Sequence, residues 1–207
     1  MKVLLIDDHP LINSGLASYL EETGRFSVSG QVNTLAEAVN FIKEAAASKT
    51  GNFPSLVILD ILLGEENGLD FIPFLNDFCR VKKLSKPPVL ICSVLEDPFR
   101  IQTALKLGAS GYIPKTGNKA DLLCAIDTVL RGETYITDEH NIKINESYGV
   151  YTQLTKRELQ VLNFIKQNKT NQQIAKVMGI NIRTVENHIS NIYFKTGKDN
   201  RLELMKL

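Results

Sequence analysis

The stretch Ser55-Leu56-Val57-Ile58-Leu59-Asp60 is a short apolar run that follows Pro54 and ends in a carboxylate. A run this short, rich in Val, Ile and Leu, is typical of a buried strand in a parallel sheet. Asp60 would then stand at the carboxyl end of that strand. Ligands of open α/β sheets bind at this end, so an acid placed there indicates chemistry more than structure.

Three further apolar runs also lead into polar or charged side chains. They are Val3-Leu4-Leu5-Ile6 before Asp7 and Asp8, Val89-Leu90-Ile91-Cys92 before Ser93, and Gly111-Tyr112-Ile113, which passes through Pro114 to Lys115. Because the carboxyl ends of parallel strands meet at one edge of a sheet, we expect the four strand ends to form one site, with Asp60 at its centre.

Segments with helical spacing of apolar residues alternate with the expected strands. The strands cover residues 3–6, 26–32, 55–59, 89–92 and 111–113, and the helices cover 10–22, 35–47, 69–78, 98–107 and 121–130. A loop, 61–68, follows the central strand. Five such βα units predict an α/β fold, a flavodoxin-like, doubly wound parallel sheet of five strands with helices on both faces.

The composition of the chain is that of ordinary globular material for one or two domains. It has 207 residues, of which 43% are hydrophobic and 23% are charged. No apolar run approaches the roughly 18 residues that span a bilayer, and Met1-Lys2 leads directly into a strand, so we expect a cytoplasmic protein without a membrane partner. Its three cysteines have no C-x-x-C spacing, which argues against a disulfide framework and a zinc site.

Charge is distributed unevenly along the chain. From Tyr151 onward there are 10 Lys and Arg against 4 Asp and Glu, a net charge of +6, whereas the first 150 residues carry 14 against 19, a net charge of −5. A small basic part joined to an acidic one indicates that the basic part meets a polyanion. We therefore expect an α/β domain at 1–131, a linker at 132–150 and a smaller all-α domain at 151–207.

Asp7, Asp8 and Asp60 would converge if the first and third strands are neighbours. Three carboxylates this close repel one another unless they share a hard divalent cation. Oxygen ligands, with a backbone carbonyl for which Leu62 is well placed, suit Mg²⁺. His9, beside the acids, is expected to be a surface residue.

Such a site can carry out phosphate chemistry. Asp60 alone ends the central strand, so it is the expected nucleophile, and its carboxylate would become an aspartyl phosphate. The ammonium group of Lys115 would neutralise charge on the transferring phosphoryl oxygens, and Ser93 could hydrogen-bond one of them.

These residues together resemble the receiver domain of two-component response regulators, over Lys2 to about Leu130. The resemblance rests on Asp7-Asp8, on Asp60 with Gly68 eight residues on, on Ser93, and on Gly-Tyr-Ile-Pro-Lys ending at Lys115. It implies that Asp60 accepts phosphate from a histidine kinase, that Asp8 with Asp7 binds Mg²⁺, that Lys115 contacts the phosphoryl group, and that Ser93 and Tyr112 form a switch pair. The chain departs from the family pattern in having Gly64 where proline is usual, Thr116 after the lysine, and the acidic pair Glu65-Glu66.

The basic part shows three helix starts. Thr155 with Glu158 and Thr170 with Gln173 form capping boxes, and Asn181 caps a third helix. A turn containing Gly179 joins the second helix to the third, which predicts a helix-turn-helix.

The third helix carries polar side chains along one face, as a helix that reads base edges in a major groove must. The expected base readers are Glu186, Asn187, Ser190 and Asn191. The expected phosphate contacts are Arg183, Thr184, Lys195 and Lys198. His188 either contacts phosphate or packs against its neighbours.

This segment resembles the LuxR-type DNA-binding domain, and the two halves together resemble response regulators of the NarL/FixJ type. Asn168 stands where the family usually has glycine, and Thr196 and Lys198 replace apolar residues. The resemblance implies a transcription regulator that phosphorylation of Asp60 controls, with promoter DNA as partner and a homodimer as the active form. The alternatives are a regulator controlled without phosphorylation, an α/β phosphotransferase or phosphatase for a small molecule, and, for the second half, a helical bundle for protein contacts.

Overall fold

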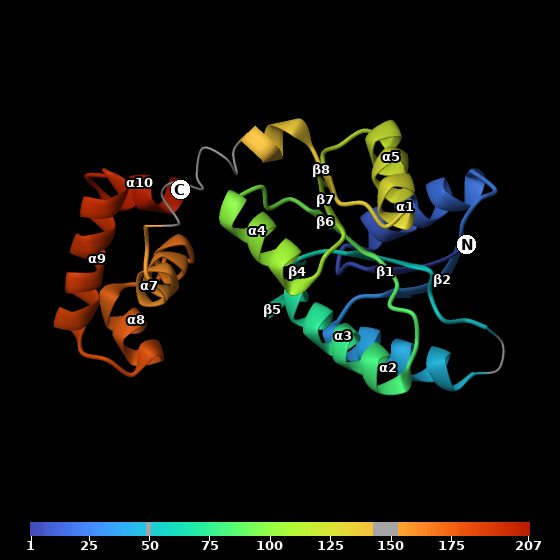
Figure 1. The fold of residues 1–207 in the computed structure, drawn as a ribbon, viewed down its shortest axis with the longest axis horizontal. Helices are drawn as coiled ribbons and strands as arrows, with labels where there is room; N and C mark the ends of the chain where they lie inside the picture. The colour runs from blue at the N-terminus through green and yellow to red at the C-terminus, as the bar shows by residue number, and fades with distance from the viewer. Residues whose placement is uncertain (49–50, 143–152) are drawn as a thin grey trace. The chain divides into compact units, whose positions relative to one another are not determined.

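A computed structural model describes residues 1–48, 51–142 and 153–207. The chain divides into two compact units, Met1–His140 and Asn141–Leu207 (Figure 1). Within the described ranges, none of the helices has the length and apolar character needed to cross a membrane.

The first unit is built on one sheet with strand order β2-β1-β3-β6-β7-β8, in which every pair is parallel. Its strands are β1 (Lys2–Ile6), β2 (Ser27–Val32), β3 (Leu56–Leu59), β6 (Val89–Ser93), β7 (Gly111–Pro114) and β8 (Tyr135–Ile136). The pairing of β1 with β3 aligns Ile6 with Leu59. The predicted doubly wound fold is therefore confirmed, and its first and third strands are neighbours.

The sheet has one strand more than the five that the sequence predicts. Tyr135 and Ile136 pair with the start of β7, and residues 138–142 are helical. Two residues are too few to show a strand period, so the sequence pattern places this segment in the linker. The first unit thus extends to His140, while residues 143–150 of the predicted linker lie outside the described part of the chain.

Helices cover both faces of the sheet. They are α1 (Pro10–Glu22), α2 (Leu35–Ala47), α3 (Phe71–Lys82), α4 (Pro98–Leu107) and α5 (Lys119–Leu130). Figure 1 shows α1 and α5 together on one side of the sheet and α2 and α3 on the other. Alternate residues of β1 point to opposite faces of the sheet. Val3 and Leu5 belong to one buried cluster, which also contains Leu20 of α1 and Ile126 of α5. The core therefore lies between the strands and the helices that cover them. The carboxyl ends of the strands can hold a functional site.

The predicted loop 61–68 contains a small hairpin. Its strands β4 (Leu62–Leu63) and β5 (Glu66–Asn67) are antiparallel, and Gly64 turns the chain with a φ of 62°. A single 3₁₀ turn, η1 (Gly68–Asp70), follows, so α3 begins at Phe71 instead of the predicted residue 69. The hairpin is thus anchored directly after the central strand.

The second unit contains four described helices, α7 (Lys156–Lys166), α8 (Asn171–Met178), α9 (Ile182–Thr196) and α10 (Arg201–Lys206). Both predicted capping boxes and the Asn181 cap are confirmed. Gly179 ends α8 with a φ of 64°, which glycine adopts without strain. Apolar residues from all four helices form the core, among them Val161, Ile174, Val185 and Leu204. The unit is a helix-turn-helix in which α9 presents its polar side outward.

Candidate functional site

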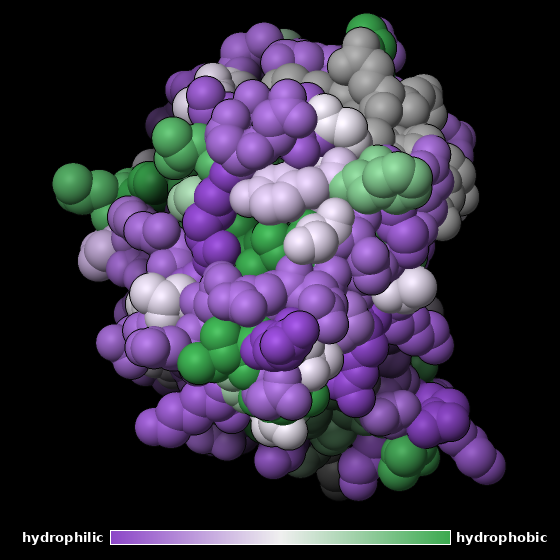
Figure 2. All heavy atoms as spheres, turned by 90° about the vertical axis from the view of Figure 1, so that its left-hand side faces the viewer, coloured by the Kyte–Doolittle hydropathy of each residue, from purple (hydrophilic) through white to green (hydrophobic). Residues whose placement is uncertain are grey.

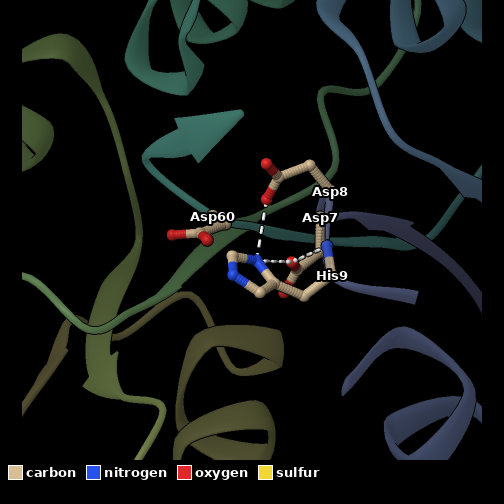
Figure 3. A group of neighbouring side chains, drawn as sticks. All are labelled: Asp7, Asp8, His9 and Asp60. Carbon is tan, nitrogen blue, oxygen red and sulfur yellow. Dashed lines mark hydrogen bonds and ion pairs between the residues drawn. The ribbon is translucent and has the colours of Figure 1, made fainter. Parts of the chain in front are cut away.

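Asp7 and Asp60 follow neighbouring strands and are both buried, with 7% and 1% of their surface exposed. One ligand atom from each of Asp7, Asp8, His9 and Asp60 can be chosen so that all four lie within 4.8 Å of one another (Figure 3). In Figure 3, dashed lines join the His9 ring to Asp7 and Asp8, and the Asp60 carboxylate enters the same small region from β3. The three acids predicted to converge therefore lie together.

Lys115 connects the acids of the two strands. Its Nζ lies 2.6 Å from Asp7 Oδ2 and 2.6 Å from Asp60 Oδ2, and its side chain is 4% exposed. Burial alone would lower the pKa of Lys115, but its hydrogen bonds to Asp60 and Asp7 outweigh that cost and raise the pKa. The site thus holds one buried ammonium group against two buried carboxylates, and a third carboxylate stands at its edge.

Asp8 is held by the hairpin. The Gly64 N–H donates to Asp8 Oδ2 at 2.8 Å, a bond that the proline usual at this position could not make. Asp8 Oδ1 is buried and makes no hydrogen bond among the described residues, although His9 Nδ1 lies 2.8 Å away. His9 keeps 57% of its side chain exposed, in line with its expected place at the surface.

Gly68 approaches the backbone of the central acid closely. A Cβ at this position would lie 2.0 Å from the Asp60 carbonyl oxygen, and the Gly68 N–H donates to Ile61 O at 2.7 Å. This contact explains physically why a glycine stands eight residues after Asp60. It also shows that the loop and the strand end are packed as one piece.

Ser93 and Tyr112 lie on adjacent strands and are both fully buried. The Leu95 N–H donates to Ser93 Oγ at 3.4 Å, and the Tyr112 hydroxyl donates to Leu95 O. Burial raises the pKa of Tyr112, so this hydroxyl stays protonated and remains a donor. The two side chains therefore meet at the loop that connects β6 to α4. The backbone N–H of Lys115 also donates to Ser93 O, at the end of β6, at 3.0 Å.

The outer side of α9 carries most of the residues predicted to contact DNA. Those exposed are Arg183, Glu186, Asn187, Ser190 and Asn191, and those partly buried are Thr184 and His188. Lys198, which is also partly buried, lies just beyond the end of α9. The view that faces the α9 side of Figure 1 is mainly hydrophilic, with scattered apolar areas (Figure 2). Thr184 also takes part in the helix cap, because its hydroxyl donates to Asn181 Oδ1 at 2.8 Å.

Lys195, which the sequence predicts as a phosphate contact, also makes an ion pair within the second unit. Its Nζ lies 2.7 Å from Glu158 Oε2 of α7, and Glu158 is only 3% exposed. Burial alone would raise the pKa of Glu158, but hydrogen bonds from Lys195 and Thr155 outweigh it and lower the pKa. Spacing along α9 could not reveal this pair, because the two residues are 37 positions apart. Lys195 thus ties α9 to α7 within the unit.

The fold and the two sites define a class of protein, in which a doubly wound domain with an acidic pocket at its strand ends is followed in the chain by a helix-turn-helix. Residues 3–127 match the response regulator receiver domain, and residues 152–207 match the luxR family of bacterial regulatory proteins. The chain belongs to the two-component response regulators with a LuxR-type domain. It is a DNA-binding transcription regulator and not an enzyme, which removes the small-molecule phosphotransferase from the alternatives.

Similar proteins align with nearly the whole length of the chain. The transcriptional regulatory protein LiaR of Bacillus subtilis (strain 168) is 30% identical over 98% of this chain and 94% of its own length. The response regulator protein VraR of Staphylococcus aureus (strain NCTC 8325 / PS 47) is 30% identical over 98% and 93%. Among solved structures, RcsB from Salmonella enterica serovar Typhimurium, bound to promoter P1flhDC with the phosphomimetic BeF₃⁻, has a TM-score of 0.70 at 19% identity, over 100% of this chain and 96% of its own.

Proposed function

We propose that Asp60 is the phosphoacceptor and that a histidine kinase is the donor. The observation that carries the proposal is the buried Asp60 carboxylate, whose Oδ2 lies 2.6 Å from the Lys115 ammonium beside a second buried acid. An oxygen of Asp60 would attack phosphorus while the bond from phosphorus to the donor imidazole nitrogen breaks, and that nitrogen keeps the electron pair. Lys115 would then move part of its hydrogen bonding to the phosphoryl oxygens, where negative charge accumulates.

The residues present suit a magnesium ion. The three carboxylates offer hard oxygen ligands, and one ligand atom from each can be chosen so that they lie within 4.8 Å of one another. Asp7, Asp8 and Asp60 would hold the ion. Leu62 would add its carbonyl, since its own N–H already donates to Asp60 Oδ1 at 3.3 Å and places it beside the site. The ion would supply charge neutralisation for the transferring group, and Lys115 alone cannot balance three acids.

We propose Ser93 and Tyr112 as the switch pair. A phosphoryl group on Asp60 would offer acceptor oxygens to the Ser93 hydroxyl, which now accepts a long bond from the Leu95 N–H. A movement of Ser93 would loosen the loop that connects β6 to α4. In that loop, the carbonyl oxygen of Leu95 accepts the hydrogen bond from the Tyr112 hydroxyl. The position of Tyr112 therefore depends on the state of Asp60.

The output is DNA binding through the exposed side of α9. Glu186, Asn187, Ser190 and Asn191 would read base edges, while Arg183, Thr184, His188 and Lys198 would contact phosphates. RcsB has been solved as two dimers bound to two parallel DNAs. By analogy the present protein would act as a homodimer on half-sites about one helical turn apart, in the cytoplasm where promoter DNA is found.

The test is selection from a random duplex library with and without BeF₃⁻ and Mg²⁺. Wild type is compared with Asp60→Ala and with Asp70→Ala, which removes an exposed acid of the same type. Tighter binding with BeF₃⁻ by wild type and Asp70→Ala, but not by Asp60→Ala, supports the proposal. If wild type and Asp60→Ala select the same DNA equally in every condition, control without phosphorylation replaces it. If no duplex is selected, the assignment of α9 fails.

A further inference from the structure

His140 is a buried imidazole that lies outside both sites described above. It belongs to helical residues 138–142, directly after β8, and only 1% of its surface is exposed. The His140 N–H donates to Thr137 Oγ1 at 3.2 Å, which ties the start of this segment to the end of the sheet. A buried polar ring normally makes specific contacts with its neighbours.

That contact is with Tyr112. The two rings meet edge to face, with centroids 5.6 Å apart and planes at 89°. Both side chains are fully buried, and protein interiors are packed as densely as organic crystals. The ring of Tyr112 therefore cannot change position without a change at His140.

His140 also approaches the loop that follows Ser93. Its Nε2 lies 3.8 Å from Glu96 Oε2, and Glu96 is the neighbour of Leu95, whose carbonyl accepts the Tyr112 hydroxyl. One imidazole thus adjoins both parts that the switch would move, namely the ring of Tyr112 and the loop that connects β6 to α4. His140 is also the last residue of the first unit, and the second unit begins at Asn141.

We propose that His140 is a positioning residue that couples Tyr112 to the chain leading to the DNA-binding unit. The inference rests on the proposed phosphorylation of Asp60. When Tyr112 follows Ser93 toward the phosphorylated site, the edge-to-face contact between the Tyr112 and His140 rings is lost. Residues 138–142 then repack against the end of the sheet. His140 touches neither the phosphoryl group nor DNA in this scheme.

The first experiment uses the histidine ring signals of the full-length protein in NMR at constant pH. The chain has three histidines, His9, His140 and His188, so each ring signal can be assigned by substitution. Adding BeF₃⁻ and Mg²⁺ should shift the signal of His9, beside the acids, and that of His140. In Tyr112→Leu the His9 shift should remain and the His140 shift should disappear.

This design separates the two hypotheses. If the His9 signal does not respond, the analogue does not bind at Asp60, and the proposed function fails together with the inference. A His9 response without a His140 response overturns the inference alone. A His140 shift that survives in Tyr112→Leu also overturns it, because the signal would then bypass Tyr112.

A second measurement follows the output, using the duplex that wild type selects from the random library. His140→Leu places an apolar side chain in the buried position but removes the ring, whereas His140→Phe keeps an aromatic ring that can make the edge-to-face contact. If BeF₃⁻ tightens wild-type binding about tenfold, His140→Leu should lose most of this gain and His140→Phe should retain most of it. Asn141→Ala, an exposed neighbour, is the matched control and should behave as wild type. Equal gains in His140→Leu and His140→Phe would show a merely structural role and overturn the proposal.

Discussion

The acidic pocket of the first unit and the α9 face of the second differ in how they are held. Asp7, Asp60 and Lys115 come from three strands, and all are buried. The α9 face comes from one helix, whose start is set by the Asn181 cap and whose polar residues face solvent. Changes at the pocket should therefore affect both stability and chemistry, whereas changes at the exposed residues of the α9 face should affect binding alone.

The largest expected effect comes from Gly68→Ala. The added Cβ would lie 2.0 Å from Asp60 O, so the backbone at the end of β3 must shift. Overpacking of this kind costs about 3 kcal/mol of unfolding free energy. The displaced Asp60 should also bind Mg²⁺ more weakly, as titration calorimetry would show.

Gly15→Ala is the matched control for this change. Gly15 lies inside α1, and a Cβ there meets nothing within 4 Å. It should stabilise the first unit by about 0.5–1 kcal/mol through helix propensity and leave Mg²⁺ binding unchanged. Equal stability of the two alanine variants would contradict the tight fit between Gly68 and Asp60.

A smaller effect is expected from Lys195→Ala, which tests whether every charge on α9 belongs to its binding surface. The substitution leaves the buried carboxylate of Glu158 without its ion pair. Lys195 is 29% exposed, so water partly replaces it, and we expect a loss of about 1–2 kcal/mol. Hydrogen exchange in α7 and α9 would assign this loss to the second unit.

Lys198→Ala provides the contrast. It should leave hydrogen exchange unchanged but lower the salt dependence of DNA binding by about one phosphate contact. If Lys195→Ala instead keeps wild-type exchange and lowers the salt dependence, Lys195 is a phosphate contact after all.

The pH dependence of the second unit should report the same ion pair. The pKa of Glu158 in the folded state is below its ordinary value near 4.5, so the carboxylate stabilises the unit above that pH. This stabilisation is lost as the pH falls below 4.5 through the folded pKa. The difference in stability between wild type and Glu158→Gln, measured from pH 6 to pH 3, should therefore shrink as the pH falls; a constant difference would show that Glu158 does not titrate with folding.

The smallest expected effect is a gain in Asn168→Gly. Asn168 follows α7 with a φ of 60°, a conformation that costs asparagine more than glycine. The substitution should raise the stability of the second unit by about 0.5 kcal/mol, measured by hydrogen exchange in α7. Asn163→Gly, the same substitution made inside α7, should lower the stability of the second unit by a few tenths of a kcal/mol. A loss in both variants would mean that the Asn168 side chain has a stabilising contact of its own.

Local signals in the sequence were sufficient for much of the fold. The apolar runs ending in Asp7, Asp60 and Ser93 predicted the strands, and the capping boxes opened by Thr155 and Thr170 predicted two helix starts. These signals work because strand burial and helix capping depend on residues a few positions apart. The strand ends that bring Asp7, Asp60 and Lys115 together follow from the flavodoxin-like order, which the same pattern indicated.

Contacts between distant segments could not be predicted in this way. The Glu158–Lys195 pair, the hydrogen bond from Gly64 to Asp8, and the packing of His140 on Tyr112 each join residues that no local pattern relates. Strand β8 could not be predicted either, because two residues show no period.

The sequence by itself determined which residues are buried strands, which are helix caps, and which polar groups stand at strand ends, because those preferences act over a few neighbouring residues. Only the tertiary structure decided that Lys195 forms an ion pair with Glu158 and that Gly68 must lack a side chain beside Asp60. The same holds for the packing of His140 against Tyr112. Dense packing is the physical reason, because it makes the environment of each buried group depend on segments far away in the chain.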